Sequence, residues 1–329
     1  MANLRAGLIG LGMMGRHHAR VLGSLEGVDL VAVADPGGDP HGVAGGRPLH
    51  ATIEDLIGEN LDYCMVAVPT IYHEEIALAL AAAGVHAMIE KPLAQDTASA
   101  QRIADAFDKA GLVGAVGHIE RYNPALQSAR KRLENGDLGK VYQVVTRRQG
   151  PFPARIADVG VVKDLATHDI DLTAWVTQQP FVSVSARTAH QAGRDYEDMV
   201  SAVGHLADGT ITNHLVNWLS PFKERLTVIT GEKGAFVAST LTADLTFHAN
   251  GSIDNRLSPD AQFRGVTEGD VIKYELKRPE PLMTEHEQFR DAVLGKESDI
   301  VTLHQGLRTV QVAEAMIQAA QDGTVITLG

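Results

Sequence analysis

The sequence predicts an α/β domain followed by an α+β domain whose sheet is open and mostly antiparallel. The chain has 329 residues, enough for two domains with a large buried core. In its first third, strand and helix patterns alternate, as in a parallel sheet covered on both faces. Further on, strand patterns follow one another with short turns, which is typical of an antiparallel sheet. We therefore expect one domain at residues 1–120 and a second at residues 121–329.

Local patterns define the elements of the first domain. Short apolar runs predict strands at residues 4–9, 28–34, 63–68, 85–89 and 112–117. Helices are expected after the first strand, from residue 52, across residues 77–83, and from residue 96 or 97 to residue 111. The second of these begins with Thr52-Ile53-Glu54-Asp55, which resembles a capping box. This alternation is that of a parallel sheet with crossover helices.

The pattern changes after His118. Helices are predicted at residues 124–133, 165–176, 285–293 and 306–320. Strands are predicted at residues 141–146, 181–186, 199–206, 211–218, 226–230, 271–276 and 325–327. Asp208-Gly209 separates two of these strands and is a strong hairpin signal, and residues 231–234 form another expected turn.

Composition and charge exclude several classes of protein. The chain is 44% apolar and 21% charged, as is usual for globular proteins, and its net charge of −12 argues against general affinity for nucleic acid. Cys64 is the only cysteine, so an internal disulfide and a cysteine-rich zinc site are excluded. No signal-peptide pattern is present, and the longest apolar stretch, residues 76–89, is too short to span a bilayer. We therefore expect a cytoplasmic protein without a membrane partner.

A glycine pattern follows the first predicted strand. Gly10, Gly12 and Gly15 form a G-x-G-x-x-G, with Met13 and Met14 between the last two glycines. In this position Gly10 makes a tight turn, Gly12 lets the backbone approach a pyrophosphate, and Gly15 lets helix and strand pack closely. The N-terminus of the following helix offers N–H groups and a positive dipole end to the anion. These residues are therefore predicted to bind a dinucleotide in a Rossmann domain.

The acid at the end of the second strand indicates which dinucleotide. Asp35 lies about twenty residues after the last glycine, where a carboxylate accepts hydrogen bonds from the adenosine ribose. It would repel a 2′-phosphate, and Pro36, Gly37 and Gly38 follow it instead of an arginine. The sequence thus favours NAD over NADP. The alternative is that Asp35 is only a turn residue at a strand end.

Two further groups of residues could carry chemistry. Lys91, in Glu90-Lys91-Pro92, follows a parallel strand at the edge where open α/β sheets bind ligands, and it could donate to a substrate oxygen. Asp164 and His168 lie four residues apart and would share one helix face, so the carboxylate could orient the imidazole. A solvated lysine, a helix cap and a surface histidine are the plainer alternatives. No metal is expected, because neighbouring residues on a helix point in different directions and hydride transfer does not require one.

Basic residues are grouped near this pair in an otherwise acidic chain. They are Arg121, Arg147, Arg148, Arg155 and Lys163. Such a group suits a diphosphate. Salt bridges on the solvent face of a sheet are the alternative interpretation.

Several motifs together carry a resemblance that covers essentially the whole chain. They are the three glycines followed by His17-His18, then Asp35, Val68-Pro69-Thr70 with His73, Glu90-Lys91-Pro92-Leu93-Ala94, and Asp164 with His168 and Asp171. In this order they resemble the Gfo/Idh/MocA family, the relatives of glucose–fructose oxidoreductase, inositol dehydrogenase and the rhizopine-catabolism proteins. The resemblance implies a Rossmann domain followed by a sheet domain that holds substrate and often mediates oligomerisation.

The resemblance also implies roles for residues. Lys91, Asp164 and His168 would gather at the nicotinamide, whose end of the cofactor site Pro69, Thr70, His73 and Glu90 would line. Two loops, residues 117–124 and 147–156, look most like those of UDP-N-acetylglucosamine 3-dehydrogenases. Val161-Val162-Lys163 departs from the glycines and apolar residues that relatives often have there. The residues expected to contact substrate are His118, Tyr122, Asn123, Arg148, Arg155 and Lys163.

The resulting hypothesis is an NAD-dependent dehydrogenase that oxidises a secondary hydroxyl of a sugar, C3 of a nucleotide sugar such as UDP-N-acetylglucosamine. Lys91 and His168 would perform the acid–base chemistry. One alternative is the same chemistry on inositol or another polyol. An alternative of another class is a non-catalytic regulator that senses NAD or a sugar. As a partner we expect a second copy of the chain, in a homodimer or homotetramer formed through the C-terminal sheet.

Overall fold

The computed structural model describes residues 2–153, 159–251 and 268–329. The chain divides into two compact units. The first consists of Met1–Tyr122 and Pro279–Glu314, and the second of Asn123–Arg278 and Ala315–Gly329. Their main break thus lies close to residue 120, and the segment 279–314 belongs with the first unit although it follows the second in sequence.

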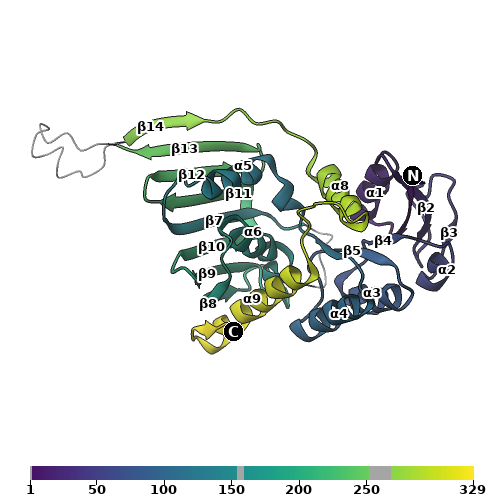
Figure 1. The fold of residues 1–329 in the computed structure, drawn as a ribbon. Coiled ribbons are helices and arrows are strands. Elements are labelled where there is room, and N and C mark those ends of the chain that lie inside the picture. Colours follow the sequence, from purple (N-terminus) through teal and green to yellow (C-terminus); the bar gives the residue numbers. More distant parts are fainter. Residues whose placement is uncertain (1, 154–158, 252–267) are drawn as a thin grey trace, which may run out of the picture. The chain divides into compact units, whose positions relative to one another are not determined.

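The first unit is built on a parallel sheet. In the described residues this sheet has six strands in the order β3-β2-β1-β4-β5-β6 (Figure 1). The strands are β1 (Leu4–Ile9), β2 (Val28–Ala34), β3 (Leu49–His50), β4 (Tyr63–Val66), β5 (His86–Glu90) and β6 (Gly114–Gly117). The order reverses between β1 and β4, which is the switch point where doubly wound sheets bind dinucleotides.

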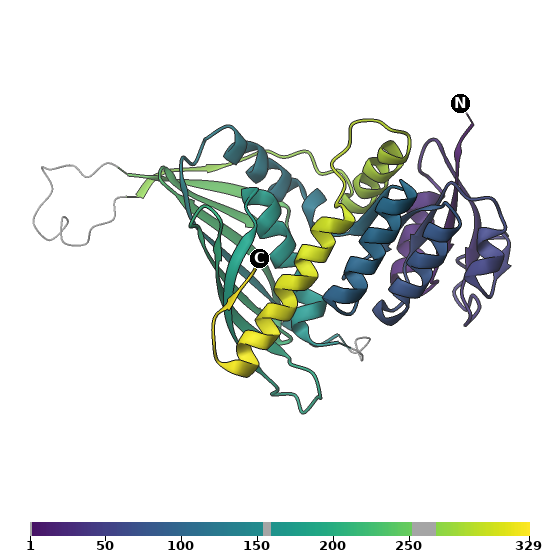
Figure 2. The same cartoon turned by 60° about the horizontal axis from the view of Figure 1, so that its bottom comes forward.

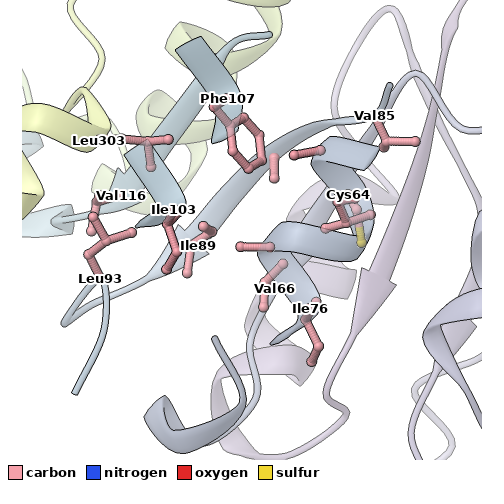
Figure 3. Packing of buried hydrophobic residues seen from close by; sticks show 14 of the residues in the cluster. Cys64, Val66, Ile76, Val85, Ile89, Leu93, Ile103, Phe107, Val116 and Leu303 are labelled. Carbon is pink, nitrogen blue, oxygen red and sulfur yellow. The ribbon is translucent and has the colours of Figure 1, made fainter. Parts of the chain in front are cut away.

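Helices bury both faces of this sheet, as the alternating pattern predicts. They are α1 (Met13–Leu22), α2 (Ile53–Ile57), η1 (Thr70–Tyr72), α3 (His73–Ala82), α4 (Thr97–Ala110), η2 (Ile119–Tyr122) and α8 (Pro281–Val293). One apolar core joins the sheet to α2, α3 and α4, and Figure 3 shows part of it around Ile89, Ile103 and Phe107. The other core contains residues of α1 and α8, and there Phe289 packs edge-to-face on Tyr63 with ring centroids 5.3 Å apart.

The second unit is built on a larger, mixed sheet. In the described residues it has nine strands in the order β14-β13-β12-β11-β7-β10-β9-β8-β15 (Figure 1). They are β7 (Val141–Pro151), β8 (Phe181–Ala189), β9 (Met199–Leu206), β10 (Ile211–Asn217), β11 (Leu219–Gly231), β12 (Gly234–Ser239), β13 (Asp244–Asn250), β14 (Glu268–Lys273) and β15 (Ile326–Thr327). All of these pairs are antiparallel except β7 with β10, which is parallel. The open, mostly antiparallel sheet is therefore confirmed.

The helices α5 (Pro124–Glu134) and α6 (Thr167–Thr177) cover one face of this sheet (Figure 2). They share a core with β7, β11, β12 and β13 in which Trp175 and Phe236 are buried. Strand β9 shows why the sheet has two different faces. Val200, Ala202, Gly204 and Leu206 are buried, whereas the residues between them are exposed.

The structure differs from the sequence prediction in several elements. Strands β12 and β13 were not predicted, because short polar and small residues interrupt the alternation of apolar residues between 234 and 250. Strand β7 continues to Pro151 through a segment predicted to be a loop. Asp164 lies in η3 (Val162–Ala166), a π-helical turn that precedes α6, and not in a regular α-helix. The last helix, α9 (Leu303–Asp322), extends beyond its predicted bounds at both ends. No helix among the described residues combines the length and apolarity that crossing a membrane requires.

Candidate active site

The glycine loop has the geometry that a bound pyrophosphate requires. Gly10 has a φ of +92°, and a Cβ there would lie 2.5 Å from the carbonyl oxygen of Ala67. A Cβ at Gly15 would lie 1.9 Å from the carbonyl oxygen of Gly10. A Cβ at Gly12, in contrast, would meet nothing within 4 Å, and no side chain caps the start of α1. Two glycines are thus needed for packing, while the third leaves room for a ligand beside a helix N-terminus.

Asp35 is fixed next to this loop. Its Oδ2 atom accepts a hydrogen bond of 2.7 Å from the backbone N–H of Leu11, and its Oδ1 atom accepts one of 2.8 Å from Gly37. The side chain is half-buried at the end of β2. These contacts hold the carboxylate beside the glycine loop, which suits the ribose of an NAD molecule bound there.

The other residues predicted to bind the cofactor lie at the same edge of the sheet. Ile9 is paired with Ala34 and Val66, Val66 with Ile89, and Glu90 with Gly117, so the carboxyl ends of these strands are level. The loops that follow carry the glycines, Asp35, Pro69, Thr70, Lys91 and His118. The fold of the first unit therefore brings these residues to one edge, where parallel sheets bind ligands.

Glu90 and Lys91 lie at the end of β5, and the peptide bond between Lys91 and Pro92 is cis. The Glu90 side chain is buried, and its Oε1 atom is 2.8 Å from Nε2 of His18. Its Oε2 atom accepts a hydrogen bond of 3.1 Å from the backbone N–H of Lys91. Burial by itself would raise the pKa of Glu90, but the His18 contact and the Lys91 charge and N–H outweigh it and hold this pKa below its usual range. Glu90 is therefore a carboxylate.

His73 does not lie as the nicotinamide-lining role implied. It is 1% exposed, and its ring faces three backbone carbonyls. Nε2 is 3.0 Å from the oxygen of Val68, and Nδ1 is 3.0 Å from that of Pro92 and 3.3 Å from that of Leu93. Burial, partly offset by these carbonyls, lowers the pKa of His73. The side chain joins the loop after β4 to the loop after β5, because the register of the parallel sheet places those two loops side by side.

In the second unit, Asp164 and His168 lie on consecutive turns. Asp164 is 5% exposed in η3, and His168 is half-buried in the first turn of α6. The start of η3 is held by Glu197, whose Oε1 atom accepts a hydrogen bond of 3.0 Å from the N–H of Val162. A Cβ at Gly160 would lie about 2 Å from that carboxylate, so a larger residue there would displace the Glu197 side chain. Glu197 supports the turn that carries Asp164. No local pattern in the sequence indicates this contact, because Glu197 and Asp164 lie 33 positions apart.

The predicted group of basic residues is not one group. Arg147 and Arg148 are neighbours on strand β7, so they point to opposite faces of the sheet. Arg147 pairs with Glu224 at 3.0 Å with its side chain 46% exposed. Arg148 is 3% exposed, and its Nε atom donates to Oδ1 of Asp169 at 2.8 Å. Arg121 donates to the side chain of Gln305 at 3.0 Å. The prediction of a grouped cluster is therefore wrong, because it treated a strand as a loop.

The remaining substrate-binding candidates fall into two sets. Tyr122 and Asn123 have structural contacts: the Tyr122 hydroxyl donates to the carbonyl of Asp299 at 3.1 Å, and Asn123 caps α5 and donates to the carbonyl of Thr240 at 3.1 Å. His118 is buried at the end of β6, and Lys163 is half-buried in η3. Arg155 lies outside the described residues.

No group of three or more histidine, cysteine, aspartate or glutamate side chains in the described part of the chain is arranged to hold a metal ion.

The fold and this edge define a dinucleotide-binding protein of the oxidoreductase class. Residues 4–118 match the family model described as the oxidoreductase family with an NAD-binding Rossmann fold. Residues 126–237 match the model of the GFO/IDH/MocA C-terminal domain. The chain belongs to the Gfo/Idh/MocA family.

Individual relatives act on different substrates. The chain is 33% identical over 216 residues to the UDP-N-acetylglucosamine 3-dehydrogenase of Acidithiobacillus ferrooxidans, covering 65% of this chain and 66% of that protein. A crystal structure of that enzyme has a TM-score of 0.83 and 27% identity, covering 98% of this chain and 99% of the other. Inositol 2-dehydrogenase 2 of Saccharopolyspora erythraea is 28% identical over 221 residues, covering 64% and 65%.

The rhizopine catabolism protein MocA of Rhizobium meliloti is 30% identical over 222 residues, covering 64% of this chain and 70% of that protein. The sequence matches to the first two of these relatives thus span just under two thirds of their length.

Proposed function

We propose that this chain is an NAD-dependent dehydrogenase that oxidises a secondary hydroxyl of a sugar. The observation that carries the proposal is the edge of the first sheet, where a glycine loop with room at Gly12 lies level with Asp35 and Lys91. A lysine at this edge suits a reaction in which a hydroxyl oxygen must be held beside the cofactor. The family membership supports the same reaction class.

The proposed roles follow from the chemistry of each group. NAD, held along residues 10–15 and Asp35, supplies the acceptor for the hydride. His168 takes the proton of the substrate hydroxyl as the hydride leaves, and Asp164 orients the imidazole. Lys91 donates a hydrogen bond to the same oxygen and stabilises the negative charge that develops on it.

We infer that the substrate is a nucleotide sugar, oxidised at C3, as with UDP-N-acetylglucosamine. The support is the likeness to the Acidithiobacillus ferrooxidans enzyme, which holds over sequence and fold. Lys163, half-buried one residue before Asp164, is the cation that we assign to a phosphate of the substrate, together with Arg155. The contact of Arg148 with Asp169 gives that arginine a structural role, and we leave it out of this assignment.

A polyol such as inositol is the second candidate. It is favoured by the inositol dehydrogenases, which match this chain at identities close to that of the nucleotide-sugar enzyme. The two substrates differ in charge. Only the nucleotide sugar would need a cation such as Lys163 for binding.

The test is NADH formation, measured by absorbance with nucleotide sugars and with polyols. With the active substrate, K91A and H168A should each lower kcat on the order of 10²–10⁴-fold, because general acid–base groups contribute that much. The dissociation constant of NAD should change little in H168A. Near-normal turnover in either variant would overturn the assigned roles. NAD binding without turnover of any substrate would favour a regulator that senses NAD or a sugar.

We also propose a homodimer or homotetramer that forms through the face of the second sheet opposite α5 and α6, in the cytoplasm. Val203 and Ile211, on neighbouring strands of that face, are 45% and 41% exposed. Apolar side chains on an exposed sheet face favour association of copies. Light scattering of the wild type and of a V203K variant measures this directly, and a monomeric wild type would contradict it.

A further inference from the structure

Two buried histidines in the first unit form a chain with Glu90. His286 lies on α8, His18 lies on α1, and both are fully buried. The Nε2 atom of His286 is 2.8 Å from Nδ1 of His18, and Nε2 of His18 is 2.8 Å from Oε1 of Glu90. The rings meet edge-to-face with centroids 5.1 Å apart. His286 comes from the segment that returns to the first unit after the second unit is complete.

The Glu90 carboxylate sets the direction of the hydrogen bond from His18. Glu90 is a carboxylate and only accepts, so Nε2 of His18 carries a hydrogen. Burial lowers the pKa of His286 well below its usual value, so His286 is neutral. The hydrogen bond between the two rings needs one donor and one acceptor, and we infer that Nε2 of His286 donates to Nδ1 of His18. Both N–H groups then point along the chain toward the carboxylate.

The far end of the chain is the loop that carries Lys91. Glu90 receives the His18 hydrogen on one oxygen and the Lys91 N–H on the other. On the opposite side, His73 contacts the carbonyl oxygens of Pro92 and Leu93. The backbone on both sides of the lysine is therefore held by buried side chains, which limits where the ammonium group can be placed.

Packing alone does not account for a histidine at position 286. Its Nδ1 atom is buried and has no hydrogen-bond partner among the described residues. A leucine would fill similar space without burying that nitrogen, and burial of a polar atom without a partner is unfavourable. The advantage of histidine here is the N–H that it gives to His18.

We propose that His286 and His18 are positioning residues for Lys91. The N–H of His286 donates to His18, the N–H of His18 donates to Glu90, and these two hydrogen bonds fix the Glu90 carboxylate. The inference rests on the proposed function in one respect only, that Lys91 contacts the substrate. The placement of Lys91 itself can be measured without any reaction.

The central comparison is H286L with H286Q. Leucine removes the donor, whereas the glutamine amide can still donate to His18. H86L is the matched control, because His86 lies at the opposite end of the same strand and its Nδ1 atom accepts a hydrogen bond from Val113 at 2.8 Å. The control thus loses a histidine hydrogen bond in the same unit, away from Glu90.

Two readouts separate positioning from stability. The first is steady-state kinetics with NAD: H286L should lower kcat about 10- to 100-fold, since small misplacements cost that much, with KM for NAD within about twofold. The second is the NMR signal of Lys91 after reductive ¹³C-methylation, assigned by its absence in K91R. The chemical shift of this signal should change in H286L, change less in H286Q and stay the same in H86L. In H86L only the melting temperature should fall.

The outcomes distinguish the positioning role of His286 from the proposed function. A folded H286L with the kcat and the Lys91 signal of the wild type overturns the proposal. If the wild type oxidises no substrate but the Lys91 signal still moves in H286L, the positioning role stands and the proposed function falls. If H286L does not fold, ¹⁵N NMR of the histidine rings in the wild type at neutral pH tests the proposal instead. A hydrogen on Nε2 alone in both His18 and His286 supports the proposed donor directions. A hydrogen on Nδ1 of His286 overturns them.

Discussion

At the scale of single residues, Arg148 and Lys163 show how the same charge serves different purposes. The Arg148 guanidinium and the Asp169 carboxylate are 3% and 2% exposed and share a hydrogen bond of 2.8 Å. Asp169 directly follows His168, so this pair anchors the first turn of α6 to strand β7. Lys163, in contrast, is half-buried in the turn before that helix.

Removing the two cations should therefore affect different properties, the free energy of unfolding for Arg148 and substrate binding for Lys163. R148A removes the guanidinium from the buried Asp169 carboxylate and should lower the free energy of unfolding by about 3–5 kcal/mol, measured by urea denaturation. K163A is expected to act on substrate binding. It should raise KM for a nucleotide sugar while kcat is kept, because a remote anchor contributes equally in ground and transition states. An R148A variant as stable as the wild type would refute the structural role.

At the scale of elements, the loop between β1 and α1 contains one glycine that the packing of the fold requires and another that leaves room for the cofactor. Gly15 must be glycine because the backbone of Gly10 occupies the position of its Cβ. Gly12 has a φ of −68°, which any residue adopts, and open space where its Cβ would be. Gly15 therefore serves the contact between strand and helix, and Gly12 leaves room for the ligand.

Alanine substitutions distinguish these two uses. G15A should destabilise the first unit by about 1–3 kcal/mol or more, because overpacking forces the backbone to shift. G12A should keep the melting temperature of the protein without cofactor and weaken NAD binding by about tenfold or more, since the methyl group takes the place of the approaching phosphate. Thermal unfolding and a fluorescence titration with NAD measure the two effects. Equal NAD affinity of G12A and the wild type would place the cofactor elsewhere.

At the scale of the whole molecule, buried histidines tie stability to pH. Burial lowers the pKa of His214 from 6.5 to about 4, and it also lowers the pKa values of His73 and His286. His214 lies on β10, where its Nδ1 atom is 2.8 Å from the hydroxyl oxygen of Thr146. These rings therefore bind protons less readily in the folded chain than in the unfolded chain, whose histidines have their ordinary pKa.

The sign of the effect follows from linkage. The contribution of the neutral His214 ring to the free energy of unfolding is complete above pH 6.5 and is lost as the pH falls toward 4. Between pH 7 and pH 5 this loss is roughly 2 kcal/mol from His214 alone. In H214Q the unfolding free energy, measured by urea denaturation at both pH values, should therefore fall by roughly 2 kcal/mol less than in the wild type. An identical pH dependence in the two proteins would mean that folding does not lower the pKa of His214.

Local patterns in the sequence were sufficient for the fold class and for the positions of the main loops. The glycine loop, the Thr52 cap of α2, the Asp96 cap of α4 and the turn at Gly209 are confirmed. Each depends on residues that are neighbours in the chain, because caps and turns are set by local hydrogen bonds and backbone angles. The order of the strands at the switch point follows from the alternation of strands with helices.

The tertiary structure decided what depends on residues far apart in the chain. His18 and His286 are separated by 268 positions, and no local pattern links them. The faces of Arg147 and Arg148 depended on β7 continuing past residue 146, which its pairing with β10 and β11 brings about. The support that Glu197 gives to η3 likewise exists only once the two segments meet. The sequence by itself determined which groups could do chemistry, and only long-range packing decided which of them are buried, paired and held in place, since burial and partners belong to the folded chain.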